Sequence, residues 1–120
     1  MIVVDLEDSD GVTGTGFSYV LGGGGKTVTH AARDMLSRFV DGQEMVPPQA
    51  LWRRLAGSLN RLGRGVGYLS IAAIDVAMWD LYARKLDMPL YRALGGVAKK
   101  LPVYGSGGFG PTQDPDAAVA

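Results

Sequence analysis

A run of four glycines followed by lysine and threonine is the stretch of this sequence most open to a chemical interpretation. The run, Gly22–Thr27, follows a predicted strand and precedes a predicted helix, which is the setting of a phosphate-binding loop. The match is incomplete, because that loop also requires a glycine five positions before Gly25, where this sequence has Val20. No second strand with a carboxylate for magnesium is evident. A phosphate- or nucleotide-binding module is therefore an alternative and not our first prediction.

A second glycine pattern, G-x-G-x-x-G, spans residues 105–110 after another predicted strand. In a dinucleotide-binding fold this pattern opens a helix. Here Pro111 and Pro115 would interrupt that helix, so the pattern alone is weak evidence for a nucleotide site. We do not predict one.

The sequence does not group the side chains that acid–base catalysis or metal binding would require. His30 is the only histidine, and no carboxylate or nucleophile is placed to orient it as a base, so we expect a surface or packing residue. Asp5, Glu7, Asp8 and Asp10 are close in sequence, but alternation along a strand and the following turn would splay them. The sequence has no cysteine for a disulfide or a thiolate zinc site. We predict no catalytic residue and no metal ligand in this chain.

The charge of the chain gives no reason to expect a polyanionic partner. Twelve basic and twelve acidic residues are dispersed along 120 residues, for a formal net charge of zero. We therefore expect neither nucleic acid nor an anionic membrane as partner. No apolar run approaches the length of a membrane span, and the N-terminus lacks the basic-then-apolar layout of a signal peptide. A cytoplasmic protein is the default expectation.

The elements that must position any site are organised around an apolar helix predicted over Leu69–Tyr82. Residues of one helical face recur there at spacings of three and four: Ile71, Ile74, Met78 and Leu81. The other faces are apolar too, so most of this helix should be covered by protein. Ser70 stands where an N-cap is expected, after a glycine-rich joint at 63–67.

The remaining pattern predicts an α+β fold. Two alternating segments, Met1–Leu6 and Val12–Tyr19, flank turn residues and predict an antiparallel hairpin, which is marginal without a third strand or a helix against it. Amphipathic helices are predicted over 28–40 and 51–59, and Pro89 can open a short helix. Leu101–Tyr104 has the pattern of a short strand. We expect a small antiparallel N-terminal sheet packed on a helical layer.

The central helix also carries a resemblance to a known family. The string Ala73–Leu81, AIDVAMWDL, is followed at fixed spacing by Pro89-Leu90 and Leu94-Gly95-Gly96. This pattern resembles the mandelate racemase and muconate-lactonising branch of the enolase superfamily, in the helical part of its N-terminal capping domain. It is not the catalytic motif of that family. We therefore expect structural roles for Asp75 and Asp80, as carboxylates that bond to nearby backbone or to a cation.

The resemblance implies a division of the chain into two parts. Residues 1–97 would be a capping domain that lacks its first strand and the specificity loop that precede this point in the family. Residues 98–120 would be the opening of a truncated TIM-type (β/α) barrel, because residues 102–108 resemble its first strand, whose C-terminal end faces the active site. Ser106 and Gly107 would then lie at the edge of the barrel active site.

The segment Thr13–Leu21 resembles the second strand of the capping domain and the loop that closes over the barrel. The similarity implies a lid against the substrate, formed by Tyr19, Val20, Leu21 and Gly22. The Phe17-Ser18-Tyr19 variant is most similar to members that act on sugar acids, although Phe17 stands near where many relatives carry an acidic residue. The alternative is that Phe17 and Tyr19 pack into the domain core and the glycines only turn the chain.

The resemblance implies a function for a whole enzyme, of which this chain would be a part. Members of the family remove a proton from the carbon next to a carboxylate, while magnesium stabilises the enediolate and a Lys or His acts as base. Those residues lie on barrel strands that this chain does not contain. We predict the capping, substrate-selecting portion of a sugar-acid dehydratase or racemase that is homo-oligomeric when full length, with magnesium and a small carboxylate bound mainly by the barrel. The alternative is a non-catalytic, stand-alone interaction domain that pairs with a separate barrel chain.

Overall fold

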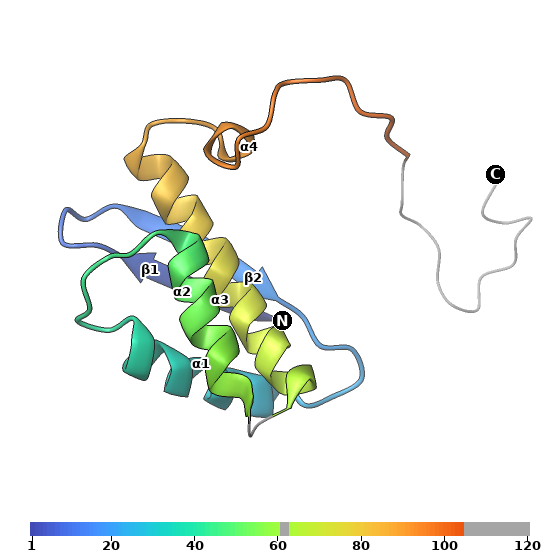
Figure 1. Cartoon of the computed structure of the whole chain (residues 1–120). Helices are drawn as coiled ribbons and strands as arrows, with labels where there is room; N and C mark the ends of the chain where they lie inside the picture. Colours follow the sequence, from blue (N-terminus) through green and yellow to red (C-terminus); the bar gives the residue numbers. More distant parts are fainter. Residues whose placement is uncertain (61–62, 105–120) are drawn as a thin grey trace, which may run out of the picture.

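A two-stranded antiparallel sheet packs against a layer of helices (Figure 1). The computed structural model describes residues 1–60 and 63–104. In chain order the elements are β1 (Ile2–Glu7), β2 (Thr13–Ser18), α1 (Gly25–Phe39), α2 (Pro48–Gly57), a 3-10 turn (Ser58–Asn60), α3 (Arg64–Lys85) and α4 (Leu90–Ala93). This order confirms the predicted α+β class with a small N-terminal sheet on a helical layer.

The hairpin buries one face and exposes the other. Val4 and Leu6 of β1 are buried, and they pair with Gly16 and Gly14 of β2. The turn between the strands is closed by Asp8, whose Oδ1 accepts hydrogen bonds from the amides of Asp10 and Val12, both at 2.9 Å. The alternation read from the sequence is therefore confirmed on both strands.

Two glycines of β2 let α3 lie directly on the strand. A Cβ atom at Gly14 would overlap the backbone of Ala77 and Leu81, and one at Gly16 would overlap the backbone of Ala73 and Ala77. Only glycine leaves room for backbone to approach this closely. The contact fixes α3 across the sheet and brings its buried face onto Val4 and Leu6.

The start of the central helix differs from the prediction. Helix α3 begins at Arg64 after Gly63, so Ser70 is not its N-cap and the expected loose joint is partly helical. Ser70 is fully buried in mid-helix, where its hydroxyl donates to the carbonyl oxygens of Val28 at 3.0 Å and of Val66 at 2.9 Å. Gly67 is buried because the Leu59 side chain fills the space of a Cβ. The serine therefore joins α3 to α1 rather than ending a helix.

The hydrophobic core lies between the sheet and the three long helices. Its most buried large side chains are Met35 of α1, Leu51 and Leu55 of α2, and Ile71 and Ile74 of α3. Helix α3 passes a test of length and composition for a membrane span, but its apolar window is 50% buried inside the domain. We describe α3 as the core helix of this fold, longer in its apolar stretch than the sequence led us to expect.

The predicted strand at Leu101–Tyr104 is wrong. Residues 101–104 have no regular secondary structure and are exposed, with Val103 at 90% and Tyr104 at 88%. A strand persists only where a neighbour pairs with it, and among the described residues nothing pairs with this segment. Figure 1 shows the chain after α4 leaving the body of the domain beyond the C-terminal end of α3.

Candidate functional site

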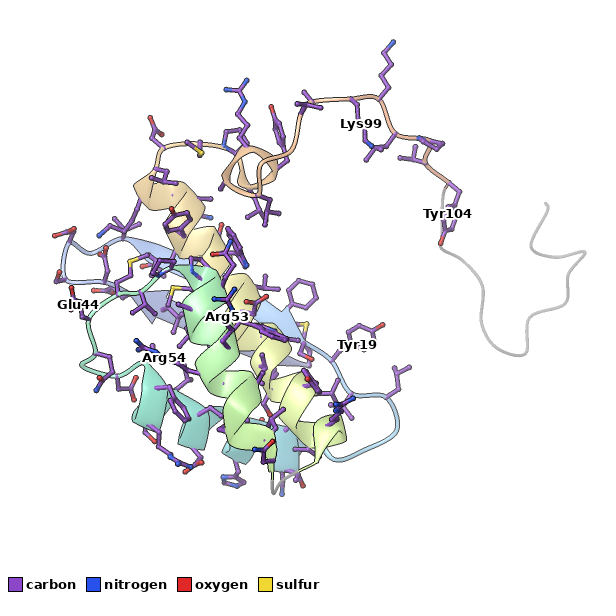
Figure 2. All side chains as sticks on the ribbon, viewed as in Figure 1. Tyr19, Glu44, Arg53, Arg54, Lys99 and Tyr104 are labelled. Atoms are coloured by element: carbon purple, nitrogen blue, oxygen red, sulfur yellow. The ribbon has the colours of Figure 1, made fainter. Side chains whose placement is uncertain are left out.

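The predicted lid residues lie together in the loop between β2 and α1. The side chains of Tyr19 and Leu21 are 60% and 85% exposed, and Val20 is half-buried. Figure 2 shows Tyr19 pointing outward from this loop. Phe17 is also exposed, because it continues the outward-facing alternation of β2. The alternative that Phe17 and Tyr19 pack into the core is therefore wrong.

The shape of this loop depends on its glycines. Gly22, Gly23 and Gly24 have φ angles of 79°, 146° and 82°, a region that side-chain-bearing residues rarely adopt. Gly24 is also the N-cap of α1, so Lys26 and Thr27 lie in the first helical turn. The loop thus presents apolar side chains on a backbone that only glycine accommodates without strain. This geometry adds no support to the phosphate-binding alternative.

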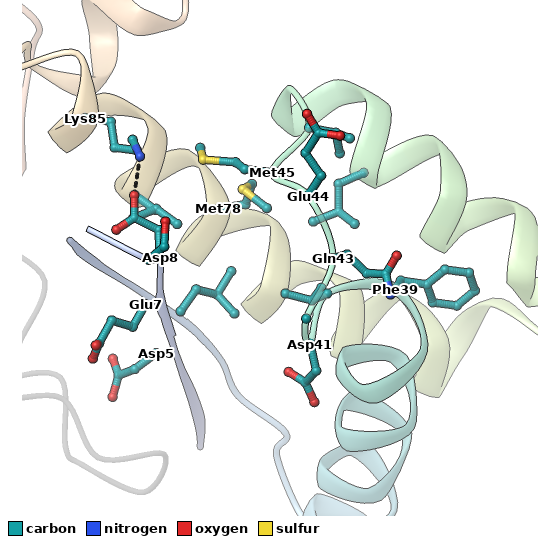
Figure 3. Close-up of a pocket in the computed structure, with 17 residues that line it drawn as sticks. Asp5, Glu7, Asp8, Phe39, Asp41, Gln43, Glu44, Met45, Met78 and Lys85 are labelled. Carbon is teal, nitrogen blue, oxygen red and sulfur yellow. Dashed lines mark hydrogen bonds and ion pairs between the residues drawn. The ribbon is translucent and has the colours of Figure 1, made fainter. Parts of the chain in front are cut away.

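A cavity of about 640 Å³ lies at the opposite end of the sheet, beside the hairpin turn (Figure 3). It is bounded by the end of β1, the connection between α1 and α2, and α3. Apolar and polar side chains line it in similar measure, with carboxylates at its rim from Asp5, Glu7, Asp8, Asp41 and Glu44. Figure 3 shows these carboxylates spread around the opening rather than converging. Such a rim would repel an anionic substrate.

The lysine that lines this cavity, Lys85, forms ion pairs within the domain. Lys85 Nζ donates to Asp8 Oδ2, and to Asp10 Oδ2 at 2.9 Å, which ties the end of α3 to the hairpin turn. The hydrogen bond from Lys85 lowers the pKa of the Asp8 carboxyl, and the same bond raises the pKa of the Lys85 amine. Lys85 is therefore a structural residue and is not available to a carboxylate ligand.

The described residues do not form a magnesium site. Across 1–60 and 63–104, no three His, Asp or Glu side chains are grouped closely enough to hold a metal ion. Magnesium prefers several oxygen ligands at near-octahedral positions, which dispersed surface carboxylates cannot supply. The predicted barrel-edge residues Ser106 and Gly107 lie outside the described residues.

The two aspartates of the α3 motif differ in their surroundings. Asp80 Oδ2 accepts hydrogen bonds from the Thr15 amide at 2.9 Å and from Arg84 Nε at 3.0 Å. Desolvation opposes its ionised form, but these bonds outweigh it and lower the pKa of Asp80. Asp75 is half-buried and has no hydrogen-bond or ion-pair partner among the described residues, and burial raises its pKa. The predicted structural role is confirmed for Asp80 and not for Asp75.

Sequence reasoning missed the contacts that hold this end of the domain together. The bonds of Lys85 to the hairpin turn span more than seventy residues, and the approach of α3 to Gly14 and Gly16 depends on tertiary packing. The available signal was the pair of alternate glycines in β2, which in a strand indicates a close backbone approach.

A short hairpin laid on a long apolar helix, with two amphipathic helices beside it, is the architecture of an α+β capping domain. Residues 1–95 match the family described as mandelate racemase / muconate lactonizing enzyme, N-terminal domain. The chain belongs to this family.

Curated relatives and solved structures agree with this assignment. The chain is 34% identical over 108 residues to a 3,6-anhydro-alpha-L-galactonate cycloisomerase of Streptomyces coelicolor, which covers 89% of this chain and 30% of the relative. It is 28% identical over 113 residues to an arabinonate dehydratase of Saccharolobus solfataricus, covering 91% of this chain and 29% of that protein.

Two solved structures share the fold. A racemase from Streptomyces coelicolor A3(2) with bound magnesium superposes with a TM-score of 0.73 at 32% identity, over 79% of this chain and 29% of that one. An L-talarate/galactarate dehydratase from Salmonella typhimurium LT2, liganded with Mg and L-lyxarohydroxamate, gives 0.63 at 28% identity, over 78% and 24%. The chain therefore spans less than a third of the length of these relatives.

Proposed function

We propose that this chain is the capping, substrate-selecting portion of a sugar-acid dehydratase or racemase. The observation that carries the proposal is the family match over residues 1–95 together with the names of its relatives. Those relatives include an arabinonate dehydratase, an L-talarate/galactarate dehydratase and an anhydrogalactonate cycloisomerase. All three names describe chemistry on a carboxylate-bearing sugar.

The proposed reaction of the whole enzyme is metal-assisted removal of a proton from the carbon next to the substrate carboxylate. Magnesium, present in two of the neighbouring structures, would supply positive charge for the enediolate. The described residues of this chain provide no ligand set for it, so the proposal assigns the metal and the base to a barrel. The 120-residue chain alone is then inactive, and the enzyme is proposed to be cytoplasmic and homo-oligomeric.

The part of the reaction proposed for this chain is closure over the substrate. Tyr19 and Leu21 project side chains into solvent from the loop between β2 and α1, and Val20 between them is half-buried. Glycines at 22–24 carry a large conformational entropy, so the loop can order on a ligand and reopen for release. We assign Tyr19, Val20, Leu21 and Gly22 as this lid, and Ser106 and Gly107 as the facing edge of the barrel.

The domain division is proposed as residues 1–97 for the cap and 98–120 for the opening of the barrel. A third strand is proposed to complete the cap at the free edge of β1. The Thr15 amide points away from β1 toward Asp80, so in this antiparallel ladder Val3 and Asp5 direct their backbone groups away from β2. A second cavity of about 270 Å³ lies along that edge, between β1 and α1. Unpaired backbone beside a groove suits an added strand.

The test is a chimera. Residues 1–95 of this chain replace the matching segment of the Streptomyces coelicolor cycloisomerase, and kcat/KM is measured for a panel of sugar acids with the parent enzyme as control. We expect the chimera to keep magnesium-dependent activity and to change its order of preference among the acids. A folded chimera that binds magnesium and turns over none of them would contradict the proposal.

A separate experiment tests the alternative that this chain pairs with a separately encoded barrel chain. The isolated 120-residue chain is added to the cycloisomerase from which the matching segment has been deleted. Recovery of activity on mixing would favour a cap that works in trans. Activity only in the fused chimera would favour a cap that works as part of one polypeptide.

A further inference from the structure

Helix α3 has one apolar face that the domain leaves uncovered. Tyr68, Ala72, Val76 and Trp79 follow one another at spacings of three and four, and they form a stripe, here called the outer stripe of α3. Tyr68 and Val76 are 38% and 40% exposed, Ala72 is exposed and Trp79 is half-buried. The opposite face of the helix is buried against the sheet. The outer stripe is therefore a surface that water reaches and that apolar residues occupy.

A carboxylate lies beside this stripe, and no cation within residues 1–60 and 63–104 pairs with it. Asp75 precedes Val76 and is one turn from Trp79, and its side chain is half-buried. The two arginines of the neighbouring helix α2, Arg53 and Arg54, are exposed (Figure 2), and no ion pair joins either of them to Asp75. Partial burial of an unpaired carboxylate is unfavourable, and a cation arriving from outside would reverse that cost.

A second copy of this chain and a lipid surface both fit the outer stripe poorly. The stripe runs from residue 68 to residue 79, so a symmetric antiparallel pairing of two α3 helices would bring the two Asp75 carboxylates within about one helical turn. Like charges so placed repel. A bilayer would solvate the apolar residues but not the carboxylate among them. The outer stripe and Asp75 together favour a protein partner whose surface is apolar and carries a positive charge.

The partner of the right size is the rest of the enzyme, which accounts for more than two thirds of each relative. We infer that the outer stripe of α3 is where the cap docks on the barrel domain, and that Asp75 pairs there with an arginine or lysine of the barrel. This inference rests on the proposed function. It gives Asp75 a positioning role, because the ion pair would set the orientation of the cap and hence of the lid.

The experiment compares the isolated chain with the chimera described above, by hydroxyl-radical footprinting. If the stripe docks on the barrel, Tyr68 and Trp79 are oxidised several-fold more slowly in the chimera, while exposed Tyr91 in α4 serves as an internal reference. Equal oxidation of Tyr68 and Trp79 in the two proteins would overturn the inference. If that chimera is nevertheless active on sugar acids, the proposed function is retained and only the docking inference is rejected.

The role of Asp75 is tested by Asp75→Asn, with Asp34→Asn as the matched control on the exposed face of α1. In the chimera, Asp75→Asn should raise the undocked fraction about tenfold, seen as faster oxidation of Trp79, because one partly buried ion pair is lost. In the isolated chain the same change should leave the urea midpoint equal or higher, since an unpaired carboxylate is removed. A lower midpoint in the isolated chain, with unchanged docking in the chimera, would show a purely internal structural role and contradict the inference.

Discussion

Asp75 and Asp80 lie five residues apart on α3, and their pKa values are shifted in opposite directions. Asp80 has its pKa lowered because the Thr15 amide and Arg84 outweigh desolvation, and it thereby covers an amide at the edge of β2. Asp75 has its pKa raised by burial and has no partner among the described residues. Asp80 therefore stabilises the contact between α3 and β2. For Asp75 we propose a partner outside this domain.

Lys85 provides a pH-dependent test at the residue scale. Because the bond from Lys85 holds the pKa of Asp8 below its ordinary value of 3.8, their contact stabilises the fold above that pH and is lost as the pH falls through the lower folded value. The pKa of Lys85 is raised above 10.5, so the contact is also lost as the pH rises beyond that value. Lys85→Ala should therefore lower the urea midpoint at pH 7 and lower it by less at pH 2.

The control for Lys85→Ala is Lys100→Ala, which removes an exposed lysine after α4. It should leave the midpoint unchanged at every pH. If Lys85→Ala lowered the midpoint by the same amount at pH 2 and pH 7, the lysine would act through packing of its alkyl chain and not through Asp8.

At the scale of the elements, the contact between α3 and β2 decides the fold. Gly16→Ala places a methyl group where the backbone of Ala73 and Ala77 lies, so the helix must move away from the strand. Forcing atoms into a filled site costs about 1–3 kcal/mol, and we expect at least that loss of unfolding free energy from urea titration. Gly57→Ala, in a helix with open space around it, should cost nothing and can stabilise by about 1 kcal/mol. Equal effects of the two changes would refute the close approach.

The two faces of α3 should respond differently to truncation. Met78 is 5% exposed and lies in the core, so Met78→Ala should cost about 2–5 kcal/mol in the isolated chain. Trp79 is half-buried on the outer stripe, so Trp79→Ala should cost clearly less there. Thermal or urea unfolding of both variants checks this order. If Trp79→Ala lost more unfolding free energy than Met78→Ala, the face of α3 that carries Trp79 would be the core face, which would contradict the structure.

Local pattern was enough to predict the hairpin, the amphipathic helices and the buried face of α3. It failed where distant packing decides the outcome. Ser70 looks like a cap in sequence, yet it is buried because Val28 of α1 offers it a carbonyl. Leu101–Tyr104 has the composition of a strand but no neighbour to pair with. The proposed lid residues were predicted from a resemblance, and their exposure could not be derived from alternation alone.

At the scale of the whole molecule, the two ends of the sheet are chemically different. The hairpin-turn end carries the cavity with an acidic rim and the paired Lys85 (Figure 3). The other end carries the exposed, glycine-supported loop with Tyr19 (Figure 2). On the proposed function, an anionic substrate would be repelled from the first end and covered by the second. This difference between the two ends supports our proposal that the substrate contact lies at the loop between β2 and α1.

The free edge of β1 yields a prediction about the completeness of the sheet. Fusing a strand-forming segment ahead of Met1 should raise the urea midpoint, because a two-stranded sheet is marginal and a third strand satisfies the open backbone groups. The matched control carries proline at alternate positions of the added strand, which removes the amides that would pair. A gain of equal size with the proline strand would show that backbone pairing at this edge is not the cause.

The measurement that tests the account most directly is substrate selectivity in the chimera when only the lid is exchanged. Residues 19–24 are returned to the sequence of the parent cycloisomerase, and the ratio of kcat/KM between the best sugar acid of the chimera and that of the parent is determined. If this chain selects substrate through its loop, the ratio moves back toward the parent value while the urea midpoint changes little. A ratio that stays at the value of the chimera would show that the loop only connects β2 to α1, and would contradict the account.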